Sequence, residues 1–433
     1  MFRHTGMLSY FKIRTGITAT MDRTTISFGQ TIRRVLIILM GVFTTLQTTR
    51  AQDSVAYQTP HYLIAPQREM SPFSNFSEGL ARYGKNYNTF GYINTDGAVA
   101  ITAEFYDAGD FHDGRAWVAK RDTVTGNLVY GFIDKKGNLR VDYRYEDAGD
   151  FASERAPVKI NGEWHYIDKK GKVVFKPIQN RKHRFYNGLV LQEKNGKYGY
   201  LDKNGAVRIP FIYEEARDFA DGRAIVEKES GVLRNQKNTP QKNALNTQRG
   251  YQYLVIDTLG TEVFDFPKHV IRISDFSDGI ASFYKMQDDN STGQWGLLDK
   301  DGHVVMEAQF SNQPFAFSDG IGMVQIDGKR PDNRDALLVT LNQEGQIIAK
   351  IPFTNTQGYR LYTSAARFQE GMLAVRMIDV QGNDLWTYMD KNGQLRFDLQ
   401  FSHARNFYEG FAIVVLAENG KIGFLKNPLE DKD

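Results

Sequence analysis

Tyr130-Gly131-Phe132-Ile133-Asp134-Lys135-Lys136-Gly137 is one copy of a phrase that returns along the chain and decides its fold. The phrase consists of an aromatic residue, Gly, two apolar residues, Asp or Asn, two variable residues and a second Gly. Other clear copies begin at Phe90, Tyr198 and Trp295. The second Gly is present in the first eight copies, at Gly97, Gly137, Gly171, Gly205, Gly260, Gly302, Gly345 and Gly393.

A second phrase, Phe-x-[Asp/Glu]-Gly-x-Ala, precedes each copy of the first. It begins at Phe76, Phe111, Phe219 and Phe276, and close variants begin at Phe151, Phe185, Phe317, Phe368 and Phe407, which gives nine starts. From the second Gly to the next start, five of the eight intervals are 14 residues, whereas the interval from a start to the Asp or Asn varies from 17 to 38 residues. One half of each unit is therefore fixed in length, and the other half accepts insertions.

The half of fixed length predicts a strand, a turn and a second strand. Asp134 can close an Asx-type turn while Gly137 adopts a positive φ, as in hairpin loops of three to five residues. Leu139 and Val141 then alternate with polar residues, which is the period of a half-buried strand. The spacing Tyr145-x-x-Ala148-x-x-Phe151 favours a single helical or irregular turn that packs one repeat on the next.

These patterns predict an all-β chain of about nine tandem three-stranded β-meander repeats, which form a superhelical or toroidal array. A β-propeller is the alternative, because blades of four strands also repeat about every 40 residues. A minimal unit of 34 residues with three visible strands favours the first description. In either case each unit buries its apolar side chains against its neighbours, so 433 residues need no single large core.

The two phrases together resemble the WG-repeat (KWG-repeat) family of bacterial proteins, over roughly residues 76–425. The resemblance implies a β-rich, often exported protein without general catalytic residues. The sequence departs from the family signature at Leu338, and at His165 and Thr387, which replace the first Gly. In the last copy, Ile422-Gly423-Phe424-Leu425 is followed by Lys426 without the Asp and Gly, which we interpret as a terminal cap.

The N-terminus has the pattern of a signal peptide. Arg33 and Arg34 precede an apolar run of about 12 residues over 35–46, and Thr49-Arg50-Ala51 offers a cleavage site. The run is shorter than the about 20 residues that span a bilayer, and an uncleaved anchor is the alternative. We expect a signal peptide over 1–51 (with a true start near Met21), a linker over 52–70, the repeat array over 71–427 and a tail over 428–433.

Composition excludes several classes of site. The absence of cysteine excludes disulfides, thiolate zinc sites, a Cys nucleophile and a lipid anchor on Cys. Residues 1–51 hold seven of the 54 Lys and Arg residues and one of the 51 acids, so the remainder has 47 basic and 50 acidic residues and a net charge of −3. Nucleic acid is therefore not an expected partner, because it would require a basic stripe.

The polar residues do not predict a catalytic, cofactor or metal site. Asp299-Lys300-Asp301-Gly302 begins like a calcium loop, but sister turns place lysines where ligands would be, so we interpret them as turns. Glu146-Asp147 and Glu214-Glu215 could support glycoside hydrolysis. Both pairs occupy the same repeat position, however, which favours a structural role.

The insertions are the better candidates for binding. They fall between the strand after each Phe start and the aromatic-Gly strand, so they should leave every repeat at the same edge. Of these loops (residues 121–129, 229–250, 287–293 and 327–336), the longest carries Arg234, Lys237, Lys242 and Arg249. The alternative is that surface loops simply tolerate length. Trp117 lies outside the recurring slots and is a further candidate contact, whereas Trp164 and Trp386 lie in slots and should be buried.

We therefore expect a non-catalytic binding or scaffold protein of the cell envelope or exterior, in the periplasm, at the cell surface or secreted. Its partner would be a protein or a polysaccharide, and the chain would be a monomer with no membrane span after removal of the signal peptide. An extracellular glycan-active enzyme and a purely structural spacer are the alternatives. The sequence leaves the identity of the ligand and the source organism open.

Overall fold

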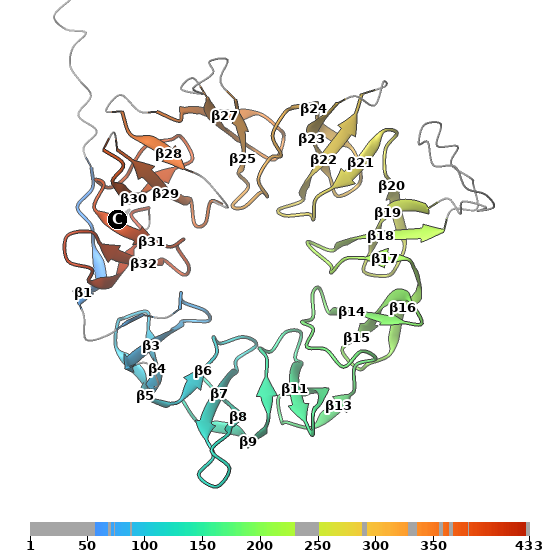
Figure 1. Ribbon diagram of the computed structural model, residues 1–433, viewed down its shortest axis with the longest axis vertical. Helices are drawn as coiled ribbons and strands as arrows, with labels where there is room; N and C mark the ends of the chain where they lie inside the picture. Colours follow the sequence, from blue (N-terminus) through green and yellow to red (C-terminus); the bar gives the residue numbers. More distant parts are fainter. Residues whose placement is uncertain are drawn as a thin grey trace, which may run out of the picture. The chain divides into compact units, whose positions relative to one another are not determined.

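The computed structural model describes residues 57–429, except 68–70, 73, 87–88, 230–250, 288–291, 328–335, 355–357, 363–366 and 380. All of these residues belong to one unit, Tyr57–Asp433. This unit is all-β, as predicted, and its described part contains 33 strands and no helix. The strands form small antiparallel sheets that follow one another around a ring (Figure 1).

The second repeat illustrates the structural unit. Its sheet has the order β6 (Asp107–Ala108), β7 (Ala116–Arg121), β8 (Leu128–Ile133) and β9 (Leu139–Tyr145). The last three strands are the predicted three-stranded meander. The predicted helical or irregular turn before Phe111 is wrong, because the chain there forms β6. As an extended strand, β6 pairs Ala108 with Val118 and so satisfies backbone groups that a turn would leave unpaired.

The other repeats vary this plan mainly in the length of the edge strands. The first four of them contain β2 (Ser71–Pro72), β3 (Leu80–Asn86), β4 (Thr89–Asn94) and β5 (Val99–Phe105); β10 (Asp147–Ala148), β11 (Ala156–Ile160), β12 (Glu163–Ile167) and β13 (Val173–Phe175); β14 (Leu189–Lys194), β15 (Lys197–Asp202) and β16 (Val207–Tyr213); and β17 (Glu215–Ala216), β18 (Arg223–Glu229), β19 (Tyr251–Asp257) and β20 (Glu262–Asp265).

The remaining repeats contain β21 (Val270–Ile273), β22 (Ile280–Met286), β23 (Gly293–Asp299) and β24 (Val304–Phe310); β25 (Gly322–Ile326), β26 (Leu337–Leu341) and β27 (Ile347–Pro352); β28 (Arg360–Tyr362), β29 (Met372–Ile378) and β30 (Asp384–Asp390); and β31 (Phe401–Ala404), β32 (Phe411–Leu416) and β33 (Ile422–Lys426). Repeats eight and nine share one seven-stranded sheet, because β31 pairs with both β30 and β32.

The first strand of the described chain closes the ring. β1 (Tyr62–Gln67) pairs antiparallel with β33, so it supplies the outer strand of the ninth repeat. The interpretation of the ninth repeat as a terminal cap is therefore wrong, because its missing strand comes from the other end of the array. The stretch 52–70, expected as a linker, contains this strand. Of the predicted arrangements, the pairing corresponds to the toroid, and four-stranded units around a central axis also fit the β-propeller alternative.

The first Gly of the recurring phrase permits a bulge in the neighbouring strand. A Cβ atom on Gly131 would lie 2.6 Å from the carbonyl oxygen of Val141 on β9. The β8–β9 pairing shifts register on either side of this residue, from Tyr130–Tyr145 to Phe132–Val141. A β-bulge of this kind brings backbone close to backbone, and Gly leaves the room for it because it has no Cβ atom.

Comparison among repeats supports this role of the Gly. Gly91, Gly199 and Gly296 show the same close approach and the same register shift, and Gly423 shows it against β1. In the repeats that carry Leu254 and Leu338 in this position, the pairing continues through the leucine without a shift. The Gly and the bulge thus occur together in these repeats. In the eighth repeat Thr387 takes the position, and the pairing there also shifts, from Trp386–Phe401 to Met389–Leu395.

The apolar core lies between repeats rather than within them. One buried cluster joins Tyr92 and Phe105 of the first repeat to Phe111 and Val118 of the second, and the rings of Tyr92 and Phe111 meet edge to face at 4.9 Å. Another cluster joins Phe76 of the first repeat to Phe424 of the last. The recurring aromatic residues therefore fasten each repeat to the next, as the sequence predicts, and fasten the last repeat to the first.

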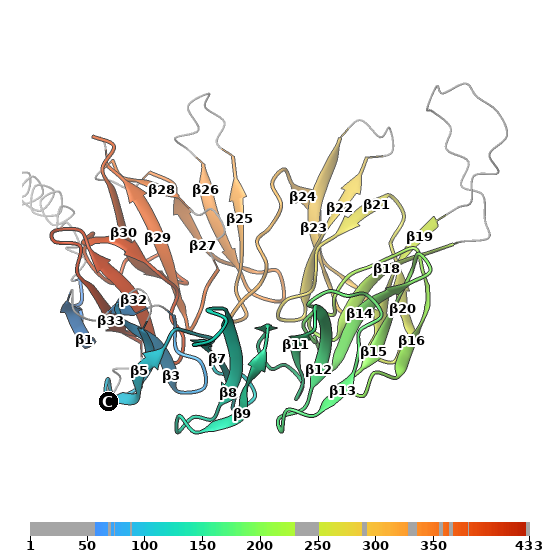
Figure 2. The ribbon, with the colours of Figure 1, turned by 60° about the horizontal axis from the view of Figure 1, so that its bottom comes forward.

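The topology gives each sheet two different ends. In an antiparallel meander of four strands, the first and third connections lie at one end and the second connection lies at the other. The Phe-x-[Asp/Glu]-Gly and Asp-x-x-Gly turns therefore share one end, which we call the turn end. The long insertions all follow the second strand and share the opposite, insertion end. Figure 2 shows the insertion-bearing ends of the β22–β23 and β25–β26 hairpins pointing the same way.

Hydrogen bonds join the turn ends into a belt. The acid or Asn of a Phe-x-[Asp/Glu]-Gly turn has a positive φ, 52° at Asp113, and its side chain accepts a hydrogen bond from a backbone N–H in the next repeat's turn. Eight such links have lengths of 2.5–3.3 Å: Glu78–Gly114, Asp113–Glu154, Asn187–Gly222, Asp221–Gly279, Asp278–Gly320, Asp319–Gly371, Glu370–Gly410 and Glu409–Gly79. We call this set the turn belt.

Candidate functional site

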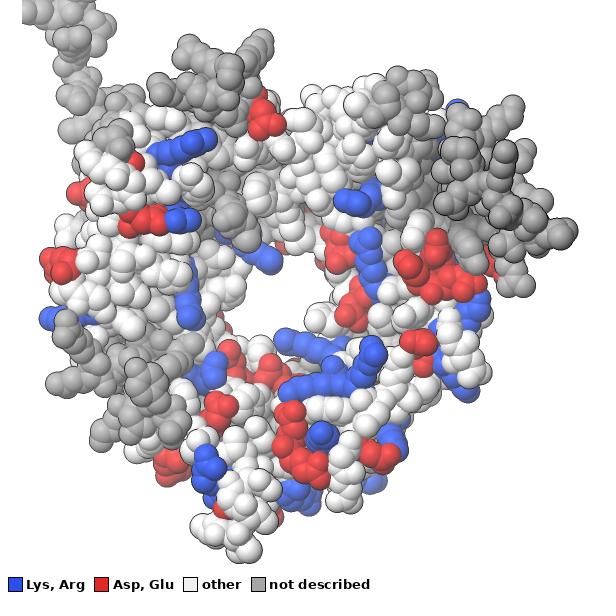
Figure 3. Space-filling view, in the orientation of Figure 1, with Lys and Arg blue, Asp and Glu red and all other residues white. Residues whose placement is uncertain are grey.

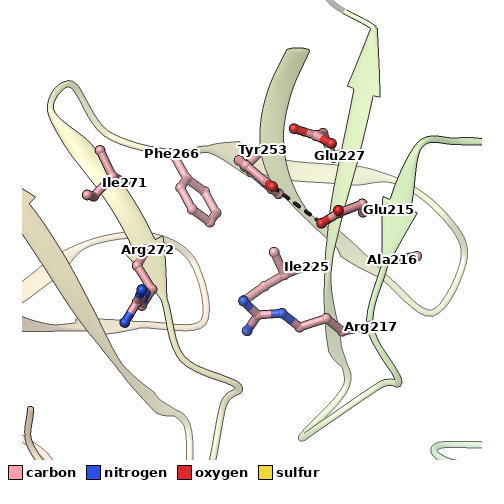
Figure 4. Close-up of a pocket in the computed structure, with 9 residues that line it drawn as sticks. All are labelled: Glu215, Ala216, Arg217, Ile225, Glu227, Tyr253, Phe266, Ile271 and Arg272. Atoms are coloured by element: carbon pink, nitrogen blue, oxygen red, sulfur yellow. Dashed lines mark hydrogen bonds between the residues drawn. The ribbon is translucent and has the colours of Figure 1, made fainter.

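A pocket of about 210 Å³ lies between the fifth and sixth repeats (Figure 4). It is close to the insertion end, because Glu227 on its wall stands two residues before Glu229, where β18 ends and the longest insertion leaves the sheet. Strands β17, β18, β19 and β21 supply most of its lining. The lining residues are Glu215, Ala216, Arg217, Ile225, Glu227, Tyr253, Phe266, Ile271 and Arg272.

Two glutamates and a tyrosine form the acidic side of the pocket. Glu215 on β17 stands directly opposite Glu227 on β18, and Glu227 stands opposite Tyr253 on β19. The Tyr253 hydroxyl donates a hydrogen bond of 3.4 Å to Glu215 Oε2. Burial raises the pKa of Glu227, and the charge of Glu215 raises it further. Burial and the charge of Glu227 raise the pKa of Tyr253 to about 12.

Among the strands that the structure describes, only the fifth repeat places two acidic residues directly opposite each other at this position. The equivalent cross-strand pairs include Asp107 with Ala119, Asp147 with Lys159, Arg272 with Tyr284, and His403 with Val415. Like charges directly opposite each other on neighbouring strands repel and destabilise a sheet. The fifth repeat therefore carries an unfavourable pair at a position where its neighbours carry a neutral or an attractive one.

Two arginines form the opposite side of the pocket. Figure 4 shows the guanidinium groups of Arg217 and Arg272 on the side away from Glu227 and the Tyr253 hydroxyl. Arg217 Nη1 donates hydrogen bonds of 3.1 Å to the Ile273 carbonyl and to Asp275 Oδ1 in the sixth repeat, which holds its guanidinium across the junction. Arg272 is exposed on β21. The charges of the pocket are thus separated, with acid at one end and base at the other.

An apolar wall lies between the two charged sides. The Phe266 ring stacks on the Tyr253 ring at 5.4 Å with an interplanar angle of 28°. Ile225 is buried beneath the pocket, and Ile271 is exposed at its edge. The pocket can therefore accept a small ligand that has charged ends and an apolar middle.

Comparison with known proteins gives the family. The family model described as "WG containing repeat" matches residues 90–123, 130–164, 166–198, 198–230, 295–329 and 386–421. The chain belongs to the WG-repeat family. Four of the matched segments begin at the aromatic residue before the first Gly, at Phe90, Tyr130, Tyr198 and Trp295, and the predicted resemblance to the family is confirmed.

No curated protein matches this WG-repeat chain in sequence. Solved structures with a similar trace include a eukaryotic initiation factor (9% identity, 78% of this chain and 97% of that chain, TM-score 0.39) and BamB from Moraxella catarrhalis (11% identity, 84% and 100%, TM-score 0.31). A third is the β-propeller domain of the Trilobed protease from Pyrococcus furiosus (11% identity, 68% and 98%, TM-score 0.33). In the described part of the WG-repeat chain, no helix has the length and apolarity needed to cross a membrane.

The Asp-x-x-Gly segments of the WG repeats are turns, as predicted. In the second repeat Asp134 Oδ1 accepts hydrogen bonds from the backbone N–H groups of Lys136 and Asn138. Burial would raise the pKa of Asp134, but hydrogen bonds from Asn138 and Arg140 outweigh burial and lower it. Asp299, Asp301 and His303 bring three potential metal ligands within 4.8 Å of one another, although Asp299 Oδ1 already accepts the N–H groups of the other two.

The predicted contact residues of the WG-repeat chain have different positions. Arg234, Lys237, Lys242 and Arg249 lie outside the described residues. Trp117 is half-buried, and its Nε1 donates a hydrogen bond of 3.0 Å to Asp150 Oδ1 in the third repeat. It therefore links two repeats. Trp164 and Trp386 are half-buried rather than buried, and each contacts a polar side chain: the Lys182 ammonium lies over the Trp164 ring, and the His403 ring lies 5.3 Å from the Trp386 ring.

A second hollow, of about 530 Å³, lies at the turn end of the third to sixth repeats. Arg184, Asn187, Asp218 and Asp275 line it, with Phe185 and Phe219 as apolar contacts. It coincides with the place where Ser153 replaces the turn acid, so the third and fourth repeats lack a link of the turn belt in the described structure. Charged side chains of both signs also surround the central opening in Figure 3, and neither sign dominates there.

Sequence reasoning missed Glu227, Tyr253 and Arg272 as site residues. It singled out Glu214-Glu215 but assigned the pair a structural role. Glu214 has that role, because its carboxylate pairs with Lys197 Nζ. Glu215 instead faces Glu227, and this juxtaposition depends on the register of β17 with β18, which no single-strand pattern contains.

Proposed function

We propose that this WG-repeat protein is a non-catalytic binding ring of the cell envelope or exterior, which holds a protein or polysaccharide partner at its insertion end. The observation that carries the proposal is the position of the pocket between the fifth and sixth repeats, beside the strand ends from which the longest insertion leaves. A rigid ring supplies the scaffold, and the loops at one end supply variable surface. Repeat proteins commonly place their binding loops in this way.

The topology supports a common binding surface. The four insertions interrupt the hairpins β7–β8, β18–β19, β22–β23 and β25–β26. These hairpins are the same connection in four repeats, so the loops leave the ring at the same end. A purely structural spacer would need no such loops.

The pocket geometry supports binding rather than glycoside hydrolysis. Residues directly opposite each other on neighbouring strands project from the same face of a sheet, so Glu215 and Glu227 stand on one wall. Hydrolysis of a glycosidic bond requires two carboxyl groups that flank the bond from different sides. The side of the pocket away from Glu227 holds the guanidinium groups of Arg217 and Arg272 instead.

Export is part of the proposal and is supported by the N-terminal sequence. Arg33 and Arg34 followed by the apolar run over 35–46 match the charged and apolar regions of a signal peptide. N-terminal sequencing of the protein recovered from cell fractions tests this part. A chain that begins near residue 52 outside the cytoplasm is the expected result, and an intact N-terminus in the cytoplasm would contradict it.

The binding function can be tested by affinity capture from an envelope extract. The bait is the protein without residues 1–51, compared with a variant in which residues 230–249 are replaced by a Gly/Ser loop of equal length. A matched control replaces residues 123–126 in the β7–β8 hairpin in the same way. We expect a captured species that is lost only with the first variant. Equal capture by all three baits would reject the insertion as the binding element.

A further inference from the structure

The pocket between the fifth and sixth repeats retains an arrangement that costs stability. Glu215 and Glu227 repel each other across the β17–β18 pair, although the equivalent Asp147 faces Lys159 in the third repeat. A Lys or neutral residue at either position would remove the repulsion without disturbing the strand pairing. Unfavourable local choices of this kind concentrate at functional sites. A positively charged group placed against the two carboxylates would convert the repulsion into attraction.

The rest of the lining narrows the class of ligand. Tyr253 and Phe266 offer aromatic surface beside the carboxylates, which favours an organic cation over a metal ion. Arg217 and Arg272 on the opposite side would repel a ligand that is only cationic, and would attract a carboxylate. The ligand should therefore carry charges of both signs.

The volume sets the size of the ligand. At about 210 Å³ the pocket is smaller than the roughly 300–1,000 Å³ of sites for drug-sized molecules. It is open enough for an extended chain of a few bonds and too small for an oligosaccharide. Its apolar wall over Ile225 and Phe266 would contact the methylene groups or the side chain between the two charged ends.

We propose that this pocket binds a small zwitterion, an amino acid or short peptide, with its ammonium group against Glu215 and Glu227 and its carboxylate against Arg217 and Arg272. The inference goes beyond the proposed function, because the pocket would bind such a ligand whether or not a larger partner occupies the insertion end. The Tyr253 hydroxyl, which donates to Glu215, holds one carboxylate toward the ammonium.

Calorimetric titration of the full-length protein with defined probes tests the proposal. The probes are 6-aminohexanoate and the dipeptide Ala-Ala, which carry both charges at different separations, and hexylamine and hexanoate, which carry one charge each. We expect at least one zwitterion to bind at least about tenfold more tightly than either singly charged probe, because each charged hydrogen-bonded contact is typically equivalent to a factor of ten or more.

Variants locate the two ends of the ligand. Glu227→Gln and Arg272→Gln should each weaken the zwitterion at least about tenfold, whereas Asp147→Asn, at the equivalent position of the third repeat, should leave it unchanged. Glu227→Gln removes a repulsion and Arg272 is exposed, so both variants should fold. The proposal is overturned if neither zwitterion binds, if hexylamine binds as tightly as both zwitterions, or if Arg272→Gln leaves the affinity unchanged. If the insertion proves unnecessary for capture of the larger partner, the affinities measured in these titrations do not change. A failure of the proposed function is therefore distinguishable from a failure of this inference.

Discussion

Glu409 Oε2 accepts a hydrogen bond of 2.7 Å from the backbone N–H of Gly79, although the two residues stand 330 positions apart in the chain. An equivalent bond joins the turns of the other consecutive repeats in the described structure except the third and fourth, and the Glu409–Gly79 bond continues the turn belt from the ninth repeat to the first. Closure here has three parts: the Glu409–Gly79 link, the β1–β33 pairing and the cluster that joins Phe76 to Phe424.

Removal of the closing link should destabilise the ring. Glu409→Ala leaves the Gly79 N–H without its charged acceptor, and we expect a loss of about 1 kcal/mol in the free energy of unfolding, measured by urea denaturation. Glu409→Gln should lower the free energy of unfolding by less, because the amide oxygen of Gln can still accept the hydrogen bond from the Gly79 N–H. Glu418→Ala in the same repeat is the control, since the Glu418 carboxylate accepts from the adjacent Asn419. Equal losses for Glu409→Ala and Glu418→Ala would contradict a role of the link.

Completion of the belt should have the opposite effect. Ser153 occupies the turn-acid position of the third repeat with a φ of 53°, close to the 52° of Asp113. Ser153→Asp places a carboxylate where it can accept a hydrogen bond from a backbone N–H in the turn of the fourth repeat. The substitution adds no backbone strain, because the φ angle already suits an Asp in this turn. We expect a gain of about 0.5–1 kcal/mol in thermal or urea unfolding, which is the usual contribution of one exposed hydrogen bond. Ala152→Asp, one residue earlier, serves as the control and should give no gain.

Only part of this organisation could be predicted from the sequence. The β8–β9 hairpin follows directly from Asp134, Gly137 and the alternation after them, because local turn chemistry and side-chain period specify it. β6 has two residues, too few for any period to be visible. β1 carries neither repeat phrase. Its pairing with β33 could therefore not be predicted from the sequence pattern, because the pairing follows from closure of the ring.

The candidate site was less accessible to sequence reasoning than the fold. Glu215 and Glu227 are both visible as acids, but their repulsion exists only in the register that places them opposite each other. Arg272 comes from the next repeat and joins the pocket through packing between repeats. The acid of the Phe-x-[Asp/Glu]-Gly phrase was also visible. Its regular recurrence without a partner in its own repeat was the signal that could have indicated a link between repeats.

Glu227→Gln should raise the stability of the ligand-free protein at neutral pH. The substitution removes the like-charge pair, and we expect a gain of at most about 1 kcal/mol in the free energy of unfolding. The folded-state pKa of Glu227 is raised above its unfolded value. Its protonation therefore favours folding, and this contribution is present at low pH and lost as the pH rises through the folded-state pKa.

The stability difference between Glu227→Gln and the unsubstituted protein should consequently disappear below about pH 4, where Glu227 is protonated in both states. Urea unfolding of both proteins at pH 7 and at pH 4 measures this difference. The other titrating groups are the same in the two proteins, so their contributions cancel when the two free energies of unfolding are subtracted. Asp147→Asn provides the comparison, because Asp147 faces Lys159 and its removal should not stabilise the protein at pH 7. A constant advantage of Glu227→Gln at both pH values would show that charge repulsion is not its cause.

Gly131→Ala tests the link between the first Gly of the repeat phrase and the bulge. The new Cβ atom would lie 2.6 Å from the Val141 carbonyl oxygen, so β9 must move or lose its bulge. Overpacking of this kind typically costs about 1–3 kcal/mol, and we expect a loss at the upper end because the obstacle is backbone. Gly162→Ala is the control: Gly162 has a φ of 78° with no atom within 4 Å of a new Cβ, so its cost is limited to about 1–2 kcal/mol of conformational strain. If the two substitutions cost the same in urea unfolding, close backbone approach does not explain the Gly. A larger cost for Gly131→Ala would explain why Leu254 and Leu338 stand where the pairing with the third strand continues through the leucine without a register shift.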